Sequence, residues 1–482
     1  KDLLTHRSGL PRHDIMWYNG QFSRQEIFER LKYLEDSEDF RSVFQYQNLM
    51  FMTAGVVEAQ VEGAPWEELV QSKIFKPLGM SSSNVSVAET QKSADYALPY
   101  EYKDPETLPE EVKKGAAPKA PEGEIKEMPF RNIDAVGPAG SINSNVTDMA
   151  KWVSMNLNEG KAGETTVVSK AQLEEIHAPA IVIRGGLFSE LFTYPEAPYM
   201  MYGMGWFIQP YRGYRLLHHG GNIDGFSAMV AFLPDEKIGF VILSNLDGNL
   251  MVDSLMFEIV DRLLGLDPLD WNSRYKLKWT QIKQALQQSE KKEEVLKKTG
   301  TKPSHPMADF AGAYESGGYG RMEIALQGPG LKVTYGTLSS SLEHWHYDIF
   351  RATEDPLKGS KISFLTNLRG DIDRLSVALE AGIEETVFRY KPPASMNDPN
   401  FLRQFPGEYE LLGLTISVAL RADNRLTLTV PGQPEYELEP YRGTEFNLKD
   451  QPGFSVKFTM QQGKVTEAIF IQPNGVFTAK RK

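Results

Sequence analysis

Residues 214–226 read YRLLHHGGNIDGF, and the runs on either side of this stretch decide the fold. Before it lies an aromatic run bounded by glycine, residues 202–207, and after it come the apolar runs Phe226–Leu233 and Ile238–Asn245. Short β-branched runs separated by Gly, Pro and Asp predict consecutive antiparallel strands joined by tight turns. The triplet His219-Gly220-Gly221 is then expected to end a strand or open a turn. Taken alone, such a triplet is more typical of turn chemistry than of catalysis.

Composition limits the classes of partner that the protein can have. The chain has 482 residues, of which 41% are hydrophobic, so it can bury large cores and is expected to hold two or three domains. It carries 52 Lys and Arg against 64 Asp and Glu, a net charge of -12, which argues against nucleic acid or an anionic membrane as the main partner. Small molecules or peptides are the expected partners. The absence of cysteine excludes disulfides, cysteine-ligated zinc and thiol nucleophiles.

Helical periodicity marks several segments that surround the predicted strands. Ser23-Arg24-Gln25-Glu26 is a capping box that predicts a surface helix after it. A largely apolar segment, Met50–Val61, predicts a buried helix, and Pro65–Phe75 repeats the helical pattern. Thr147 is the expected N-cap of a helix that runs through Leu157, and Met251–Leu264 is an expected amphipathic helix.

Two stretches lack the pattern of a packed element. Between about Ala97 and Arg131, five prolines lie among many Glu and Lys, which predicts a long irregular excursion, either a lid or a solvated loop. Residues Gln287–Lys298 are dominated by Glu, Lys and Gln, which predicts a solvated linker helix.

The C-terminal third contains an internal repeat. Phe310-Ala311-Gly312-Ala313-Tyr314 recurs 95 residues later as Phe405-Pro406-Gly407-Glu408-Tyr409. The match continues nearly in step and, after a short deletion, to the end of both copies, through the pairs Ile324 and Val418, Leu326 and Leu420, Leu331 and Leu426, Val333 and Leu428, Phe364 and Phe458, and Val387-Phe388 and Val476-Phe477. Alternating apolar and polar residues in short runs predict two small antiparallel β-barrels in tandem.

One pair of histidines, His344 and His346, has the spacing that would place both on one face of a strand in the first barrel. No third metal ligand is evident near them in the sequence, so a structural role is expected. No metal or organic cofactor is implied by the sequence.

Six segments occur in a defined order over residues 1 to about 265: LLTHRSGLP at 3–11, YQN at 46–48, IFKPLGM at 74–80, AGS at 139–141, YGMGW at 202–206 and HGG at 219–221. In this order they resemble the motifs of the serine β-lactamase and penicillin-binding-protein-like hydrolases, particularly the class C β-lactamase, esterase and D-aminopeptidase branch. The resemblance implies an α+β, β-lactamase/transpeptidase-like domain, with an antiparallel sheet flanked by helices. Two barrels after such a domain are similar to the D-aminopeptidase arrangement.

The resulting domain prediction divides the chain into four parts. An N-terminally incomplete hydrolase domain covers residues 1–285 and a charged linker covers residues 286–305. The first barrel is expected at residues 306–392 and the second at residues 399–482.

The resemblance also implies roles for individual residues. Tyr46 matches the tyrosine of the family's Tyr-x-Asn motif and is the expected base, although a phenol has a reference pKa of ~10 and needs cationic neighbours. Asn48 would hydrogen-bond the substrate's amide carbonyl and the catalytic lysine. His219 matches the basic position of the Lys/His-x-Gly motif, where it would polarise the tyrosine or orient a substrate carboxylate.

Residues after His219 are expected to bind the substrate. Gly220 and Gly221 have no side chain beyond hydrogen, so the protein backbone can approach a ligand closely there. Gly221 would let the substrate lie against the strand edge. The N–H of Asn222 is the expected second oxyanion donor, beside the N–H of the nucleophile itself. Without the other motifs, Tyr46 and Asn48 would be interpreted as an ordinary turn that enters a helix.

One departure from the family pattern concerns the nucleophile. The family's serine lies in a Ser-x-x-Lys motif that belongs before the Thr5-His6 segment, and this chain starts too late to contain it. Chance matches at Ser273 and Ser289 follow His219, in the wrong order, and are rejected. The chain is therefore expected to be a fragment whose first helix and strands precede Lys1, with a relative that lost its nucleophile as the alternative.

Two functions from different classes follow. In the first, the protein is a serine hydrolase that cleaves a D-residue peptide, a small ester or a β-lactam through an acyl-enzyme. In the second, it is a catalytically inactive family member that acts as a binding or scaffold protein for peptides or cell-wall fragments. Export from a bacterial cell and a homo-oligomer formed through the barrels are further expectations. The irregular stretches 97–131 and 178–199 are expected to shape the pocket.

Overall fold

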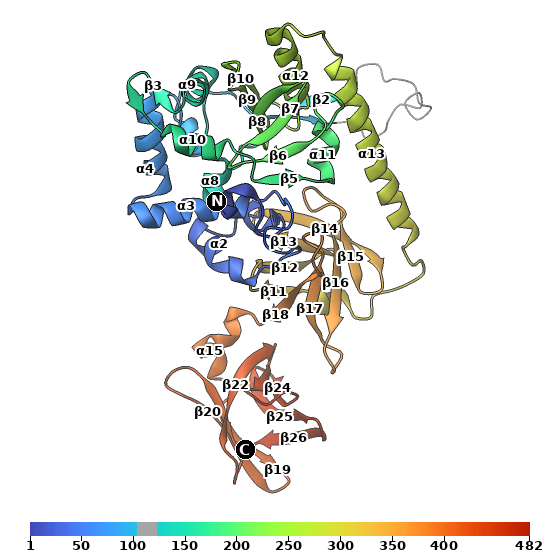
Figure 1. Ribbon diagram of the computed structural model, residues 1–482. Helices are drawn as coiled ribbons and strands as arrows, with labels where there is room; N and C mark the ends of the chain where they lie inside the picture. The colour runs from blue at the N-terminus through green and yellow to red at the C-terminus, as the bar shows by residue number, and fades with distance from the viewer. Residues whose placement is uncertain (104–122) are drawn as a thin grey trace. The chain divides into compact units, whose positions relative to one another are not determined.

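The computed structural model describes residues 1–103 and 123–482 (Figure 1). The chain forms two compact units, one made of Lys1–Lys297 with Leu379–Glu384 and the other of Lys298–Ala378 with Glu385–Lys482. Among the described residues, no helix combines the length and apolar character that crossing a membrane requires.

A six-stranded antiparallel sheet forms the centre of the first unit, in the order β10-β9-β8-β7-β6-β5. Its strands are β5 (Ile181–Ile183), β6 (Met200–Tyr202), β7 (Phe207–Tyr211), β8 (Tyr214–Ile223), β9 (Phe226–Leu233) and β10 (Ile238–Ser244). The three consecutive strands predicted around residue 219 are confirmed. The predicted place of His219-Gly220-Gly221 at a strand end is wrong, because β8 continues to Ile223 and turns only at Asp224-Gly225.

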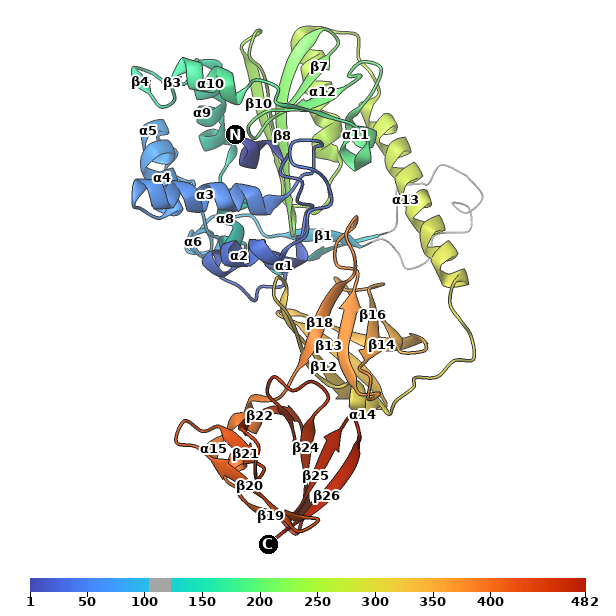
Figure 2. The ribbon, with the colours of Figure 1, turned by 60° about the horizontal axis from the view of Figure 1, so that its bottom comes forward.

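Helices cover both faces of this sheet (Figures 1 and 2). On one face, α12 (Met251–Leu264) and α13 (Trp271–Val295) bury an aromatic core in which Phe257 stacks on Trp271 with ring centroids 4.6 Å apart. On the other face, α9 (Val146–Leu157) packs Val153 against Trp206 and Phe232. The apolar faces of these helices explain why both sides of the strands are buried.

Helices before the sheet form a second layer of the first unit. The capping box at Ser23 is confirmed, since its side chain accepts from the Glu26 N–H and the Glu26 carboxylate accepts from the Ser23 N–H. The predicted N-cap at Thr147 is wrong. Asn145 caps α9 by accepting from the Asp148 N–H at 2.9 Å, because the helix begins at Val146 and Thr147 already lies inside it.

The remaining elements of the first unit are short, apart from α3. They are η1 (Asp2–Thr5), α1 (Ile15–Tyr18), α2 (Arg24–Arg30), η2 (Leu31–Tyr33), α3 (Asn48–Glu62), α4 (Trp66–Val70), η3 (Gln71–Phe75), α5 (Lys76–Leu78), α6 (Val87–Thr90), η4 (Asp134–Val136), α8 (Gly137–Gly140), β3 (Lys161–Ala162), β4 (Thr165–Thr166), α10 (Lys170–Ile176) and α11 (Gly186–Phe192).

The stretch predicted to be irregular, residues 97–131, is in part regular. Two strands, β1 (Tyr100–Lys103) and β2 (Glu124–Glu127), pair in antiparallel register within it. β1 alternates Tyr with charged residues, but β2 has a single Ile among charged residues, so the sequence gives little strand signal among the prolines. Four of those prolines, Pro105, Pro109, Pro118 and Pro121, lie outside the described residues.

The second unit consists of two closed eight-stranded antiparallel barrels (Figure 2). After α14 (Met307–Phe310), the first barrel contains β11 (Gly312–Ser316), β12 (Gly320–Gln327), β13 (Gly330–Tyr335), β14 (Leu338–His346), β15 (Ile349–Ala352), β16 (Lys361–Thr366), β17 (Ile372–Val377) and β18 (Thr386–Lys391). After η5 (Ala394–Asn397) and α15 (Pro399–Leu402), the second contains β19 (Gly407–Leu411), β20 (Leu414–Leu420), β21 (Leu426–Thr429), β22 (Glu435–Arg442), β23 (Glu445–Leu448), β24 (Ser455–Gln461), β25 (Lys464–Gln472) and β26 (Gly475–Arg481).

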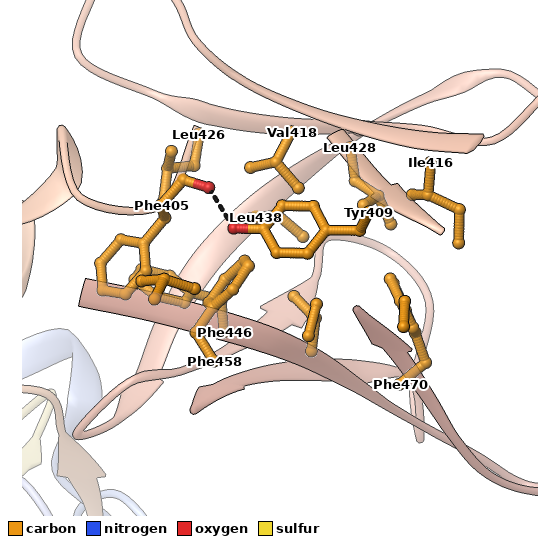
Figure 3. Close-up of a cluster of buried hydrophobic side chains, with 14 of the residues drawn as sticks. Phe405, Tyr409, Ile416, Val418, Leu426, Leu428, Leu438, Phe446, Phe458 and Phe470 are labelled. Atoms are coloured by element: carbon orange, nitrogen blue, oxygen red, sulfur yellow. Dashed lines mark hydrogen bonds between the residues drawn. The ribbon is translucent and has the colours of Figure 1, made fainter. Parts of the chain in front are cut away.

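The same tyrosine contact begins both barrels. The Tyr314 hydroxyl donates to the Phe310 carbonyl at 2.9 Å, and the Tyr409 hydroxyl donates to the Phe405 carbonyl at 2.6 Å. Figure 3 shows this bond inside the second barrel, where Phe405 and Tyr409 lie among the aliphatic and aromatic side chains of the core. Because a buried hydroxyl needs a partner, this contact fixes how the first strand enters each barrel.

Strand register corrects the end of the predicted repeat. Tyr314 pairs with Tyr390 and the equivalent Tyr409 pairs with Arg481, so Phe388 corresponds to Ala479 rather than to Phe477. Burial agrees, since Phe388 and Ala479 are both fully buried. The sequence comparison paired Val387-Phe388 with Val476-Phe477 because the residues are chemically similar. In the barrels, equivalent positions are those whose side chains point inward at the same place in the register.

Candidate active site

Tyr46 lies where the chain enters α3. The Gln47 side chain caps the helix by accepting from the Met50 N–H at 3.0 Å, which fixes the backbone just after Tyr46. The phenol ring lies 6.1 Å from the imidazole of His219, measured between ring centroids. The structure thus brings together the two residues predicted to be catalytic, from segments 173 positions apart in the sequence. Burial raises the pKa of the Tyr46 hydroxyl, and the charge of Arg12 opposes that rise.

His219 is held by both of its ring nitrogens. Nδ1 lies 2.6 Å from the Gly220 carbonyl oxygen and Nε2 lies 3.0 Å from the Tyr202 hydroxyl. A carbonyl oxygen only accepts, so the contact with Gly220 assigns the proton to Nδ1 and leaves Nε2 to accept from Tyr202. Burial lowers the pKa of His219, and the imidazole is therefore neutral at physiological pH.

Two further residues, His6 and Tyr202, belong to the surroundings of Tyr46. The His6 ring lies 4.3 Å from the ring of Tyr46 and 4.9 Å from that of Tyr202. Its Nδ1 accepts from the Gln47 N–H at 3.2 Å, and burial holds its pKa well below the usual value. Both residues lie inside the LLTHRSGLP and YGMGW segments, but their partners come from distant parts of the chain, so the sequence assigned them no role.

The residues after His219 lie on a free strand edge. β7 begins at Phe207, which pairs with His218, and β9 pairs with β8 as far as Ile223. Within residues 1–103 and 123–482, no strand pairs with residues 219–223 on the side away from β9. Gly220, Gly221 and Asn222 therefore expose one backbone edge.

The orientation of the Asn222 N–H follows from the register. The two-residue turn Asp224-Gly225 makes Ile223 and Phe226 a hydrogen-bonded pair, and such pairs alternate along an antiparallel ladder. Asn222 is one step away, so its N–H is directed to the free edge. Its side chain holds the hairpin, with Oδ1 accepting from the Ser227 hydroxyl at 2.8 Å and from the Gly248 N–H at 2.9 Å.

Asn48 is the first residue of α3, and its amide is tied to a residue that the sequence did not single out. Asn48 Nδ2 donates to Asp14 Oδ1 at 3.2 Å. Asp14 follows the LLTHRSGLP segment closely, yet nothing in its spacing predicted a contact with the Tyr-x-Asn motif.

Other residues considered from the sequence lie elsewhere. Ser273 and Ser289, the two rejected nucleophiles, are both in α13, whose neighbours are α11 and α12. His344 Nε2 contacts the Tyr347 carbonyl oxygen at 2.8 Å, and His346 Nδ1 accepts from the Lys298 N–H at 3.2 Å. Among the described residues, no three His, Asp or Glu side chains gather as a metal site.

Known proteins resemble the chain in two regions. Residues 1–262 match the family described as Beta-lactamase, and residues 296–390 match a domain of unknown function, DUF3471. The chain is 27% identical over 342 residues to the unguisins hydrolase ungD' of Aspergillus campestris, with 67% of this chain and 58% of that protein covered. It is 28% identical over 378 residues to the unguisins hydrolase ungD of Aspergillus violaceofuscus, with 73% and 64% covered. The chain thus spans about three fifths of the length of these relatives.

Among solved structures, the fold is similar to an octameric penicillin-binding protein homologue from Pyrococcus abyssi. The similarity has a TM-score of 0.45 at 19% identity and covers 80% of this chain and 77% of that one.

Proposed function

The chain belongs to the Beta-lactamase family of hydrolases, and from this premise we propose that it is a serine hydrolase that cleaves an amide or ester through an acyl-enzyme. The observation that carries the proposal is the approach of Tyr46 to His219, with ring centroids 6.1 Å apart, beside the free edge of β8. In the proposed reaction, this arrangement would supply a base, a neutral imidazole and backbone donors at one place.

In the proposed reaction, the oxygen of a serine hydroxyl attacks the substrate carbonyl carbon and its proton passes to Tyr46. The C–N or C–O bond of the tetrahedral intermediate then breaks as the leaving group takes that proton, and water hydrolyses the resulting ester by the same route. The Asn222 N–H would stabilise the oxyanion beside the N–H of the serine. His219, neutral and bonded to Tyr202, would polarise Tyr46 or orient the substrate.

Tyr46 needs help to act as a base, because burial raises the pKa of its hydroxyl. The ammonium of the Ser-x-x-Lys lysine, three positions after the serine on a helix turn, would favour the phenolate. The proposal therefore requires a Ser-x-x-Lys serine in the natural polypeptide, and that requirement makes it testable.

The test is the intact mass of the natural full-length protein before and after treatment with a fluorophosphonate. We expect one adduct per chain, located by peptide mapping on the serine of a Ser-x-x-Lys segment. Tyr46→Phe should slow adduct formation by about 10²- to 10⁴-fold, the usual contribution of a general base. Tyr33→Phe is the matched control, since Tyr33 is 57% exposed and lies in η2, and this variant should react at the original rate.

Substrates would then be compared by turnover of D-residue amides, small esters, a penicillin and unguisins, the last because two relatives are named for hydrolysing them. A natural chain that takes no adduct and turns over none of these would contradict the hydrolase proposal. It would leave the pocket as a binding site for peptides or cell-wall fragments.

A further inference from the structure

An arginine lies over the face of the proposed base. The guanidinium carbon of Arg12 is 5.3 Å from the centroid of the Tyr46 ring, a cation–π distance. The Arg12 side chain is 47% exposed, so its charge remains in contact with solvent while it faces the ring. No motif of the sequence assigned a role to this residue.

One carboxylate fixes both Arg12 and Asn48. Asp14 Oδ2 accepts from Arg12 Nε at 2.6 Å and pairs with Nη2 at 2.5 Å. Asp14 Oδ1 accepts from Trp17 Nε1 at 2.9 Å and from Asn48 Nδ2 at 3.2 Å. With four donors on two oxygens, the carboxylate has little freedom to rotate, and it connects the guanidinium over Tyr46 to the amide two residues beyond it.

Three other titratable groups near Tyr46 are His6, His219 and Tyr202. Burial lowers the pKa of both histidines, and burial raises that of Tyr202, so all three are neutral near pH 7. The charges of Arg12 and Asp14 act on Tyr46 in opposite directions, Arg12 lowering its pKa and Asp14 raising it.

One more carboxyl borders the Arg12–Asp14 pair. Glu380 lies in Leu379–Glu384, the second segment of the first unit, and its carboxylate accepts from the His13 N–H at 2.5 Å. His13 is the residue between Arg12 and Asp14. The interactions of Glu380 itself are with His13, Ala381, Asp14 and Arg12.

We propose that Arg12 and Asp14 are a positioning pair for the proposed active site: Asp14 holds the guanidinium of Arg12 over Tyr46 and, through its other oxygen, holds the amide of Asn48. The pair rests on the proposed function in that Tyr46 and Asn48 are the groups it serves. Its electrostatic effect, however, is a property of the folded chain that is present whether or not the chain turns over a substrate.

The experiment is a titration of Tyr46 in the full-length protein, followed by the ultraviolet absorbance of the phenolate, with the titration of Tyr46→Phe subtracted. Arg12→Gln should raise the midpoint by about half a pH unit or more, the size of a unit charge at this distance near solvent. Asp14→Asn should lower the midpoint, because a negative charge is removed. Arg12→Lys and Asp14→Glu keep the charges and should titrate close to the original protein.

Arg262→Gln is the matched control, since Arg262 is an exposed arginine on α12 that pairs with Glu258 four residues earlier. In this variant the midpoint of the Tyr46 titration should not move. Opposite shifts for Arg12→Gln and Asp14→Asn support the pair. Shifts no larger than that of Arg262→Gln would overturn the pair, because the two charges would then have no effect on Tyr46. Shifts in the same direction would also overturn it, because the two charges would then not have opposite effects on the Tyr46 titration.

In the active full-length enzyme, the pH profile of kcat/KM should move in the same direction as the midpoint of each variant. Asp14→Asn should also raise KM more than Arg12→Gln does, because only Asp14 contacts Asn48. The titration does not depend on turnover. A failed titration contradicts the positioning pair, whereas a missing fluorophosphonate adduct contradicts the proposed function.

Discussion

The two barrels differ most clearly in the hairpin that joins their last two strands. In the second barrel, β25 and β26 remain paired up to Gln472 and Gly475, around the two-residue turn Pro473-Asn474. In the first barrel, the pairing of β17 and β18 ends at Val377 and Thr386, and eight residues connect them without a ladder. The equivalent strands of the second barrel, from Phe470 to Phe477, are connected by six residues, four of which extend the ladder.

This difference shows that the residues that close the barrel and the residues of its exposed hairpin have changed to different extents. The buried positions at the start of the first strand are the same in both copies, whereas the exposed hairpin is not. Six of its residues in the first barrel, Leu379–Glu384, belong to the compact unit that contains Tyr46 and His219, and Glu380 accepts a hydrogen bond from His13. The two barrels thus share the buried residues at the start of the first strand and differ in the length of the hairpin between the last two strands. Added length in such a loop costs little stability.

The largest effect is expected at the phenylalanine that starts each barrel. Phe310 and Phe405 are both fully buried, so Phe310→Ala and Phe405→Ala should each cost roughly 3–5 kcal/mol of unfolding free energy. Hydrogen exchange should show the loss of protection first in β11–β18 for Phe310→Ala and in β19–β26 for Phe405→Ala. A large loss for one substitution and almost none for the other would break the equivalence of the two barrels.

A smaller effect, and a difference between the copies, is expected at the glycine two residues later. Gly312 and Gly407 have φ angles of 153° and 156°, which strain any other residue. A Cβ at Gly312 would lie 2.5 Å from Cε2 of Tyr390, whereas a Cβ at Gly407 would lie 3.0 Å from Nε of Arg481, on a longer and more flexible side chain.

Gly312→Ala should therefore cost about 2–3 kcal/mol and Gly407→Ala about 1–2 kcal/mol, measured by denaturant unfolding. Gly475→Ala is a control at a similar φ of 148°, and it reports mainly the backbone strain because its Cβ would make only ordinary contacts, the nearest at 3.4 Å from Cζ of Phe477. Equal losses at Gly312 and Gly407 would mean that the neighbouring side chain has no part in the difference.

These residues also show how far the sequence was informative. The repeat of Phe310-x-Gly312-x-Tyr314 predicted two barrels because buried closure positions are conserved in kind between the copies, and the α+β domain before them is confirmed. The end of the repeat was predicted wrongly, since loop length is free to change and the match Phe388 to Phe477 ignored which side chain points inward.

In the candidate site, too, some residues could be predicted from the sequence and others could not. Tyr46 and His219 could be named because each lies in a short segment that resembles a family motif, and the structure places their rings 6.1 Å apart. Asp14, His6 and Tyr202 could not be assigned, because their roles depend on contacts between segments that are far apart in the sequence. Asp14 in particular contacts Asn48 across 34 positions, and no local pattern records such a contact.

The next effect concerns the tyrosine hydroxyls of the two barrels. Tyr314→Phe and Tyr409→Phe each remove one buried hydrogen bond, to the carbonyl of Phe310 or Phe405, and leave the ring in place. Each should cost about 1 kcal/mol, the common net value of such a bond, with the unsatisfied carbonyl adding to the loss. Thermal unfolding of the two variants and of the double variant checks this. Because the two hydroxyls lie in different barrel cores, the two losses should add, and a strong departure from additivity would show that the cores are coupled.

The smallest effect is expected in the hairpin itself, and it depends on pH. Burial, reinforced by the charge of Asp14, raises the pKa of the Glu380 carboxyl, although the N–H groups of His13 and Ala381 and the charge of Arg12 oppose the rise. A raised pKa means that the folded protein holds this proton more tightly than the unfolded chain. The contribution to stability is therefore present below the ordinary glutamate pKa and is lost as pH rises through the raised value.

Glu380→Gln does not titrate, so the Tm of the original protein minus that of Glu380→Gln should fall across this pH window and stay constant above it. Glu164→Gln, an exposed glutamate in the turn between β3 and β4, is the matched control and should give a flat difference. A flat difference for Glu380 as well would mean that its burial against His13 does not persist in solution. A difference that rises with pH would mean that the His13 N–H stabilises the carboxylate more than burial destabilises it, and the hairpin would then be held by that bond rather than merely placed beside it.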